Sequence, residues 1–155
     1  MKHTRDEVID RTVGEFELLD KAIARLTEAD WSRPVGRPGS KDPWTIKDVV
    51  AHVTHWKADV VRSLRRERRP AEERGLTITK GNRLVYLRWH DVPPAEVLAW
   101  HRRVHMEMLA ALRDAPEAWF AGKERREDWP FDAVGHIAEH RVRDVERALR
   151  GRAGS

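Results

Sequence analysis

Residues 43–56 read PWTIKDVVAHVTHW and carry the clearest indication of the fold. Thr45 is a favourable helix N-cap residue, and Asp48 in the first turn would interact well with the positive end of the helix dipole. Apolar residues then recur at helical spacing as far as Leu64. The inward positions are Ile46, Val49, Val53, Trp56, Val60 and Leu64. The stretch predicts a buried amphipathic helix that starts at Thr45 and contains His52.

Three further segments show the same helical periodicity. They cover residues 4–26, residues 94–113 and a last segment that begins near Pro130 and ends at Gly151. Residues 76–92 are compatible with a short hairpin, an irregular crossover or an early start of the next helix, and these alternatives stay open. Four amphipathic helices with at least one long connection predict an all-α fold, a four-helix bundle with long crossover connections. We expect one domain over residues 1–155.

Composition narrows the function classes. The 155 residues include no cysteine, which excludes disulfides, thiolate zinc sites and a cysteine nucleophile, so any metal needs histidine and oxygen ligands. The first ten residues, MKHTRDEVID, are charged where a secretory signal would be apolar, and no apolar run is long enough to cross a bilayer. We therefore expect a cytoplasmic protein with no membrane segment.

The charge balance gives little support to nucleic-acid binding. The chain has 30 basic and 26 acidic residues, interleaved in the manner of solvated helix faces. One segment before Pro70 is locally basic and contains Arg62, Arg65, Arg66, Arg68 and Arg69. Because no aromatic interleaving or nucleic-acid motif accompanies it, we do not expect nucleic acid as a partner. The alternative is a non-catalytic module that assembles through a helix face, with a homodimer among its forms, or that contacts nucleic acid through the segment from Arg62 to Arg69.

Three histidines suggest a metal site. His136 and His140 lie four residues apart within VGHIAEHRVRD, so on a helix both imidazoles project from one face, and His52 could complete a set of three. Such a set leaves coordination positions open, as catalytic sites do. On the helical wheel His52 lies just beside the apolar stripe, and the other two lie nearer the polar side. That placement fits a solvent-open groove, and it also fits ordinary surface histidines.

Other polar residues are candidates for supporting roles. His101 and His105 fall in the apolar stripe of residues 94–113, where buried histidines usually form hydrogen bonds within a core, although they could also shuttle protons or contact substrate. Asp59 and Asp144 lie two turns beyond His52 and one turn beyond His140, where they could orient an imidazole or accept a proton. His55, one turn before Asp59, is expected to form an exposed ion pair with it.

Two tryptophans bracket His52 in the sequence. Trp44 precedes the helix and Trp56 follows His52 by one turn, so both could wall a pocket beside an ion. Packing at helix ends is the ordinary role of such large amphipathic rings. Both residues are therefore pocket candidates, with core packing as the alternative.

The sequence resembles the DinB/YfiT-like four-helix bundles, which include mycothiol-dependent isomerases, and within them the ClbS-like branch. The resemblance rests on PWTIKDVVAHVTHW, on VGHIAEHRVRDVERAL in the last segment, and on an Asn82-Arg83 loop followed by PAEVLAWHRRVHMEML. These motifs cover most of the chain in the right order. The resemblance implies a bundle with a metal at one end, bound by His52, His136 and His140, and in many relatives chemistry on a small molecule or a thiol.

We accordingly expect zinc, nickel or iron held by three imidazoles, with a thiol cofactor as an option and a small electrophilic molecule as substrate. The protein would then be a metal-dependent hydrolase or a thiol-dependent transferase of the detoxification or self-protection type. The alternative is a metal-free ClbS-like protein that binds or hydrolyses a reactive small molecule, because some members of that branch lack a complete metal site.

Overall fold

The structure, a computed structural model, describes residues 3–37, 39–120 and 143–151. Its helices are α1 (Arg5–Ile23), η1 (Glu28–Ser32), α2 (Ile46–Leu64), η2 (Ala71–Glu73), α3 (Ile78–Trp89), α4 (Pro94–Asp114) and α5 (Glu117–Phe120), and residues 143–150 are also helical. These described parts contain no β-strand, only an isolated bridge between Pro34 and Thr45. The predicted all-α fold is confirmed.

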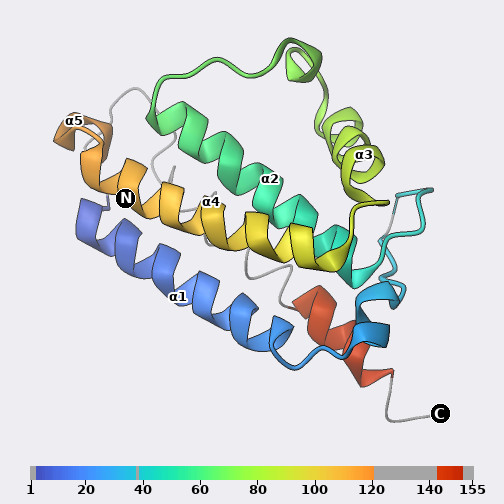
Figure 1. Ribbon diagram of the computed structural model, residues 1–155. Coiled ribbons are helices and arrows are strands. Elements are labelled where there is room, and N and C mark those ends of the chain that lie inside the picture. Colours follow the sequence, from blue (N-terminus) through green and yellow to red (C-terminus); the bar gives the residue numbers. More distant parts are fainter. Residues whose placement is uncertain (1–2, 38, 121–142, 152–155) are drawn as a thin grey trace.

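Three long helices lie side by side and form most of the bundle (Figure 1). α4 packs against both α1 and α2, while α3 packs against α2 on another side. The helix at residues 143–150 adds Val145 to the core around the first half of α2. α2 is thus surrounded by helices, which explains why fifteen of its nineteen residues are buried. No helix among the described residues is long and apolar enough to cross a membrane.

The helix starts follow the sequence closely. Thr45 caps α2, and Thr4 caps α1, each in a full capping box with the acidic residue three positions later. α4 begins at Pro94, where the missing N–H costs nothing because the first turn has no intrahelical acceptor for it. The first turns of these helices are therefore encoded locally.

Residues 76–92 contain a separate helix, so the hairpin alternative is wrong. Thr77 caps α3 by accepting a hydrogen bond from the backbone N–H of Lys80 at 3.3 Å. The helix ends at Trp89 because Pro93 and Pro94 follow, and proline cannot continue a helix from within. Asn82 and Arg83, which the sequence suggested lie in a loop, are inside α3.

The buried residues form two apolar clusters with a polar layer between them. The first cluster includes Leu19, Val49, Val53, Val97 and Val145, and the second includes Val8, Val60, Val61, Met108 and Leu112. Along each of the three long helices, buried polar residues fall between members of the two clusters. Six of them are Thr12 and Glu15 on α1, Thr54 and Lys57 on α2, and His101 and His105 on α4. We call these six residues the polar layer; His55 and Asp59 on α2 also fall in this interval but pair with Glu73 and Arg69 outside the three long helices.

Candidate functional site

His52 lies in the first half of α2 with only 5% of its surface exposed. Its ring meets the edges of two tryptophan rings, at centroid distances of 5.2 Å to Trp44 and 6.3 Å to Trp56. Both pocket candidates therefore contact the histidine that they bracket in sequence. His52 is an enclosed imidazole in an aromatic setting rather than a surface residue.

Trp44 is held in place by the strand-like segment before α2. Its carbonyl accepts a hydrogen bond from the N–H of Val35 at 2.8 Å, and the N–H of Ile46 reaches the carbonyl of Arg33 at 3.1 Å. The indole stacks on Tyr86 of α3, with centroids 5.9 Å apart. These contacts explain why Trp44 is 3% exposed although it precedes the helix.

The start of α2 is also tied to the end of α3. Asp48, besides closing the capping box, accepts a hydrogen bond from Nδ1 of His90, with 3.0 Å to Oδ2. Nζ of Lys47 binds the backbone carbonyls of Trp89 and His90. Burial lowers the pKa of Lys47, and the neighbouring Asp48 carboxylate acts against that effect. His90, which nothing in the sequence distinguished, thus has a defined structural contact.

The other two predicted metal ligands, His136 and His140, lie outside the described residues. Within those residues, no group of three histidine, aspartate or glutamate side chains gathers into a metal-binding set. Asp144 lies in the helical residues 143–150 with its carboxylate 3.9 Å from the guanidinium of Arg147. Imidazole nitrogens, the donors predicted for this site, suit zinc, nickel or iron.

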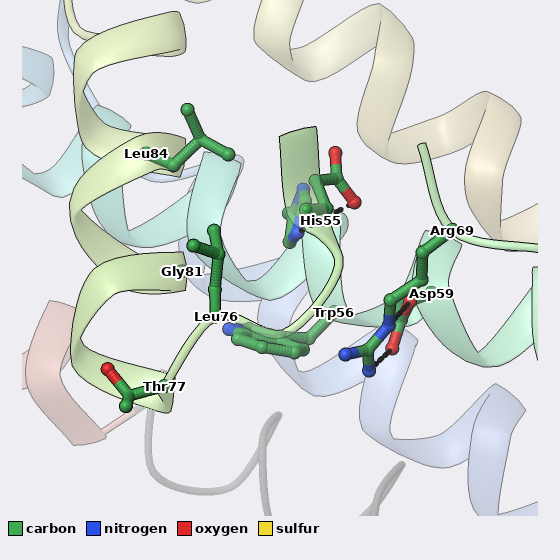
Figure 2. A pocket seen from close by; sticks show the side chains of 9 residues that line it. His55, Trp56, Asp59, Arg69, Leu76, Thr77, Gly81 and Leu84 are labelled. Carbon is green, nitrogen blue, oxygen red and sulfur yellow. Dashed lines mark hydrogen bonds and ion pairs between the residues drawn. The ribbon is translucent and has the colours of Figure 1, made fainter. Parts of the chain in front are cut away.

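Asp59 and His55 are placed differently from the sequence interpretation (Figure 2). Asp59 binds the guanidinium of Arg69 through two hydrogen bonds, one of them 2.7 Å from Nε to Oδ1. His55 is buried, not exposed, and its Nε2 lies 4.0 Å from Oε2 of Glu73. Burial lowers the pKa of His55, and the Glu73 carboxylate opposes that shift. The prediction that His55 and Asp59 form an exposed ion pair is therefore wrong.

The reason is the crossover between α2 and α3, which folds back over α2. Glu73 in this crossover accepts hydrogen bonds from Arg62 of α2 at 3.2 Å and from Arg88 of α3 at 2.9 Å. Below it lies a cavity of about 20 Å³, room for about one water molecule, with His55 and Trp56 in its lining. Helical periodicity cannot predict that the crossover buries His55, because this burial depends on where the segment between α2 and α3 packs.

His101 is fully buried in the polar layer, and its hydrogen bonding determines its tautomer. The hydroxyl of Thr54 donates its proton to the carbonyl of Val50 at 2.8 Å. The hydroxyl oxygen of Thr54 also lies 3.4 Å from Nδ1 of His101. Because its proton is already donated to Val50, this oxygen can only accept a hydrogen bond from the imidazole, so Nδ1 of His101 carries the proton. Nε2 of His101 is then an acceptor, and no hydrogen-bond partner for it exists among the described residues. The core placement predicted for His101 and His105 is observed.

Lys57 is one of the residues of this layer that sequence reasoning missed. It is 1% exposed, and no acceptor for its Nζ is found in the described part of the chain. Burial lowers its pKa to about 8, opposed by the charge of Glu15. Burial and this neighbouring lysine lower the pKa of His101 to about 3 and of His105 to about 4. The sequence feature that could have identified Lys57 is its position on the apolar stripe of α2, between Val53 and Val60.

A surface pocket of about 410 Å³ includes Trp44 in its lining but not His52. Its lining comes from the loop before α2 and from the first half of α3. The residues are Arg37, Gly39, Ser40, Lys41, Asp42, Trp44, Thr79, Asn82 and Arg83. The guanidinium of Arg37 lies 4.1 Å from the centroid of the Trp44 ring. Trp44 thus borders both this pocket and His52.

Residues 14–146 match the family described as the mycothiol maleylpyruvate isomerase N-terminal domain. The chain belongs to this family. The resemblance to the DinB/YfiT-like superfamily is thereby confirmed. His52, a predicted metal ligand, lies inside the matched segment. No curated protein matches the sequence.

Two solved structures share the fold of this mycothiol maleylpyruvate isomerase N-terminal family member. An uncharacterised protein from Escherichia coli UTI89 has a TM-score of 0.79 at 12% identity, covering 100% of this chain and 98% of that one. The colibactin self-resistance protein ClbS, solved in complex with a dsDNA, has a TM-score of 0.72 at 13% identity, covering 98% and 97%. At these identities the likeness shows the fold alone.

Proposed function

We propose that the protein binds a divalent transition metal through His52, His136 and His140 and acts on a small electrophilic molecule, as a hydrolase or a thiol-dependent transferase. The supporting observation is the enclosure of His52, which is 5% exposed and bordered by Trp44 and Trp56. Val145, five residues after His140 in the sequence, belongs to the same apolar cluster as Val49 and Ala51 around His52. Family membership over residues 14–146 adds support.

The chain's own residues define what such a site would do. A bound divalent ion acidifies a thiol or water near neutral pH and polarises an electrophile. Trp44 and Trp56 would keep bulk water from the imidazole of His52, which strengthens every electrostatic interaction there. Asp144 is the carboxylate best placed in sequence to orient His140, whereas Asp59 is engaged by Arg69. We therefore assign Asp59 a structural part in this proposal.

The test is elemental analysis of protein purified without a histidine tag or chelator, beside the variants His52→Gln, His140→Ala and His3→Ala. We expect near-stoichiometric zinc, nickel or iron in the wild type and in His3→Ala, and its loss in the other two. Far-ultraviolet circular dichroism checks that each variant is folded. Unchanged metal content in His52→Gln and His140→Ala would refute the metal site.

A metal-free small-molecule protein is the second candidate, and it makes a different prediction. The pocket beside Trp44 is open to solvent and does not include His52 in its lining, so it could hold a ligand without an ion. Under this alternative, activity or binding survives a chelator and both histidine substitutions. Metal-dependent activity that a chelator abolishes and added zinc restores would eliminate it.

Nucleic acid is a weaker candidate for this chain, although ClbS was solved with a dsDNA. Two of the five arginines between residues 62 and 69 are already paired with carboxylates, Arg62 with Glu73 and Arg69 with Asp59. Phosphate contacts would have to compete with those pairs. We expect only weak DNA binding that falls steeply with salt.

A further inference from the structure

The pocket beside Trp44 carries an excess of positive charge. Arg37, Lys41 and Arg83 contribute three cations to its lining, against one carboxylate from Asp42. Asp42 lies 3.9 Å from Nη1 of Arg83, a loose pair whose arginine side chain is 61% exposed. The charge of Arg83 is therefore only partly offset, and the lining keeps a net charge of +2 by this count, three minus one.

Three other pockets in the described parts of the chain differ in this respect. The pocket along α1, of about 480 Å³, is lined by Asp10, Glu15 and Glu17 against two basic residues. The pocket near residues 143–151 has one acid and one base. The small cavity under the crossover holds Asp59 and Glu73 beside one arginine and His55. The positive charge is thus a property of the pocket beside Trp44, not of every hollow on the molecule.

The pocket also presents neutral hydrogen-bonding groups. Ser40, Thr79 and Asn82 supply two hydroxyls and an amide to the lining. The indole N–H of Trp44 is itself buried and is therefore not counted among the donors of the pocket.

We propose that this pocket binds the carboxylate or phosphate group of an anionic small molecule, with Lys41, Arg37 and Arg83 supplying charge and Ser40, Thr79 and Asn82 supplying neutral hydrogen-bonding groups. The proposal deepens the proposed function, on which it rests for the view that this ligand is the substrate. Trp44 also contacts His52, so this indole is shared by the anion pocket and the surroundings of the predicted metal ligand.

The shape favours a small molecule over a nucleic-acid backbone. A volume of about 410 Å³ lies within the range of about 300 to 1,000 Å³ usual for small-molecule pockets. The neutral donors and Asp42 within the same pocket suit a ligand that has hydroxyl or amino groups besides its anionic group. A row of phosphates would instead call for basic residues along an extended surface.

The test is binding of inorganic phosphate and of succinate, measured by isothermal titration calorimetry at constant ionic strength with metal-free and metal-loaded protein. The double variant Lys41→Gln with Arg83→Gln removes two charges from the pocket. The matched control, Lys80→Gln with Arg113→Gln, removes two exposed charges that do not line it. We expect the first variant to weaken binding about tenfold and the control to change it less than about twofold.

Each other result has a defined meaning. If neither anion binds saturably, or if both double variants weaken binding equally, the pocket is not an anion site. If a 12-base-pair duplex binds more tightly than both small anions and loses affinity in the pocket variant, the site belongs to a nucleic-acid surface and the small-molecule assignment is wrong. Anion binding by a protein that holds no metal would retain this inference and refute the metal site. Stoichiometric metal without anion binding would do the reverse.

Discussion

The ring of Phe16 on α1 stacks on the ring of His105 on α4, with centroids 3.7 Å apart and planes 8° from parallel. The same phenyl ring lies 4.9 Å from the ring of His101 and 5.5 Å from Nζ of Lys57 on α2. Phe16 therefore brings α1 into contact with polar side chains of α2 and α4 at one level of the bundle. Because Thr54 also contacts His101, these groups form a connected cluster and not a scatter of isolated buried groups.

Burying these polar groups lowers the stability of the fold, and the layer is compatible with only one alignment of the helices. A buried charge without an acceptor is destabilising, and a helix shifted by one turn would bring Lys57 against the apolar residues of either cluster. We interpret the layer as a device that fixes the relative register of α1, α2 and α4, on which the position of His52 depends.

Lys57→Met should stabilise the protein. Methionine fills a similar volume and removes a buried ammonium group, so we expect the free energy of unfolding at pH 7 to rise by about 1 to 3 kcal/mol. Urea unfolding followed by circular dichroism measures it. The surface substitution Lys80→Met is the control and should change stability by less than about 0.5 kcal/mol. A less stable Lys57→Met protein would show that the ammonium group has a partner that the register argument omits.

The stabilisation by Lys57→Met should shrink as the pH rises. The pKa of Lys57 is about 8 in the folded protein and 10.5 for the unperturbed side chain. Between these values the unfolded chain binds more protons than the folded one, so wild-type stability increases with pH while that of the variant does not. The difference between the two proteins should fall by on the order of 2 kcal/mol from pH 7 to pH 10. A constant difference would contradict the lowered pKa.

His105 should make the protein acid-sensitive. Its pKa is about 4 when folded and 6.5 when unperturbed, so the unfolded chain takes up a proton that the folded chain excludes. The stability from the neutral ring is present above pH 6.5 and is lost as the pH falls toward 4. Relative to His105→Phe, the wild type should lose about 2 kcal/mol between pH 7 and pH 5. Above pH 7 the two stability curves should run parallel, and parallel curves below pH 6 would refute the assignment.

The fold was predictable because its signals are local. Thr45, Asp48 and the apolar stripe after them depend only on helix geometry and capping, and α2 begins where they predict. Pro94 similarly marks the start of α4. The helix at residues 78–89 was ambiguous because α3 has only two buried residues, Val85 and Tyr86, which is too few to give a clear helical period.

The candidate site was predictable only in part. The rings of His52, Trp44 and Trp56 lie close together. His52 and Trp56 are one turn apart on α2, and Trp44 directly precedes the N-cap of that helix, so the spacing in the sequence predicts this proximity. His55 was interpreted wrongly and Lys57 was missed because α3, α4, η1 and the crossover after α2 all pack on this helix. None of its faces is therefore the solvent face that a helical wheel assumes. Pairings between segments, such as Arg69 with Asp59, have no local signature at all.

Arg66→Gly should stabilise the end of α2. Arg66 has φ 58°, a left-handed conformation that glycine adopts without the steric cost of a Cβ. The N–H of Glu67 bonds to the carbonyl of Arg62 at 2.9 Å and that of Arg66 to Ser63 at 3.2 Å, which is the Schellman pattern that favours glycine here. We expect a gain of about 0.5 to 1 kcal/mol in thermal or urea unfolding. Arg68→Gly, two residues on, removes the same charge and should give no gain; equal effects would assign the result to charge.

Arg69→Gln should destabilise the protein by holding the crossover less firmly. The substitution leaves Asp59, which is 8% exposed, without the guanidinium that binds both its oxygens, so we expect a loss of about 1 to 3 kcal/mol. Asp59→Asn should cost less than this, and the double variant should be no worse than Arg69→Gln alone, because a neutral side chain no longer needs the cation. The neighbouring Arg68→Gln is the charge-matched control.

The same variants separate a structural role for Asp59 from a role in metal binding. If Asp59 serves only to anchor the crossover through Arg69, Asp59→Asn lowers stability and leaves the metal content at the wild-type level. If it orients the imidazole of His52, metal is lost in Asp59→Asn but retained in Arg69→Gln, since removing the arginine leaves the carboxylate in place. Because the two oxygens of Asp59 are both directed to Arg69, we expect the first result.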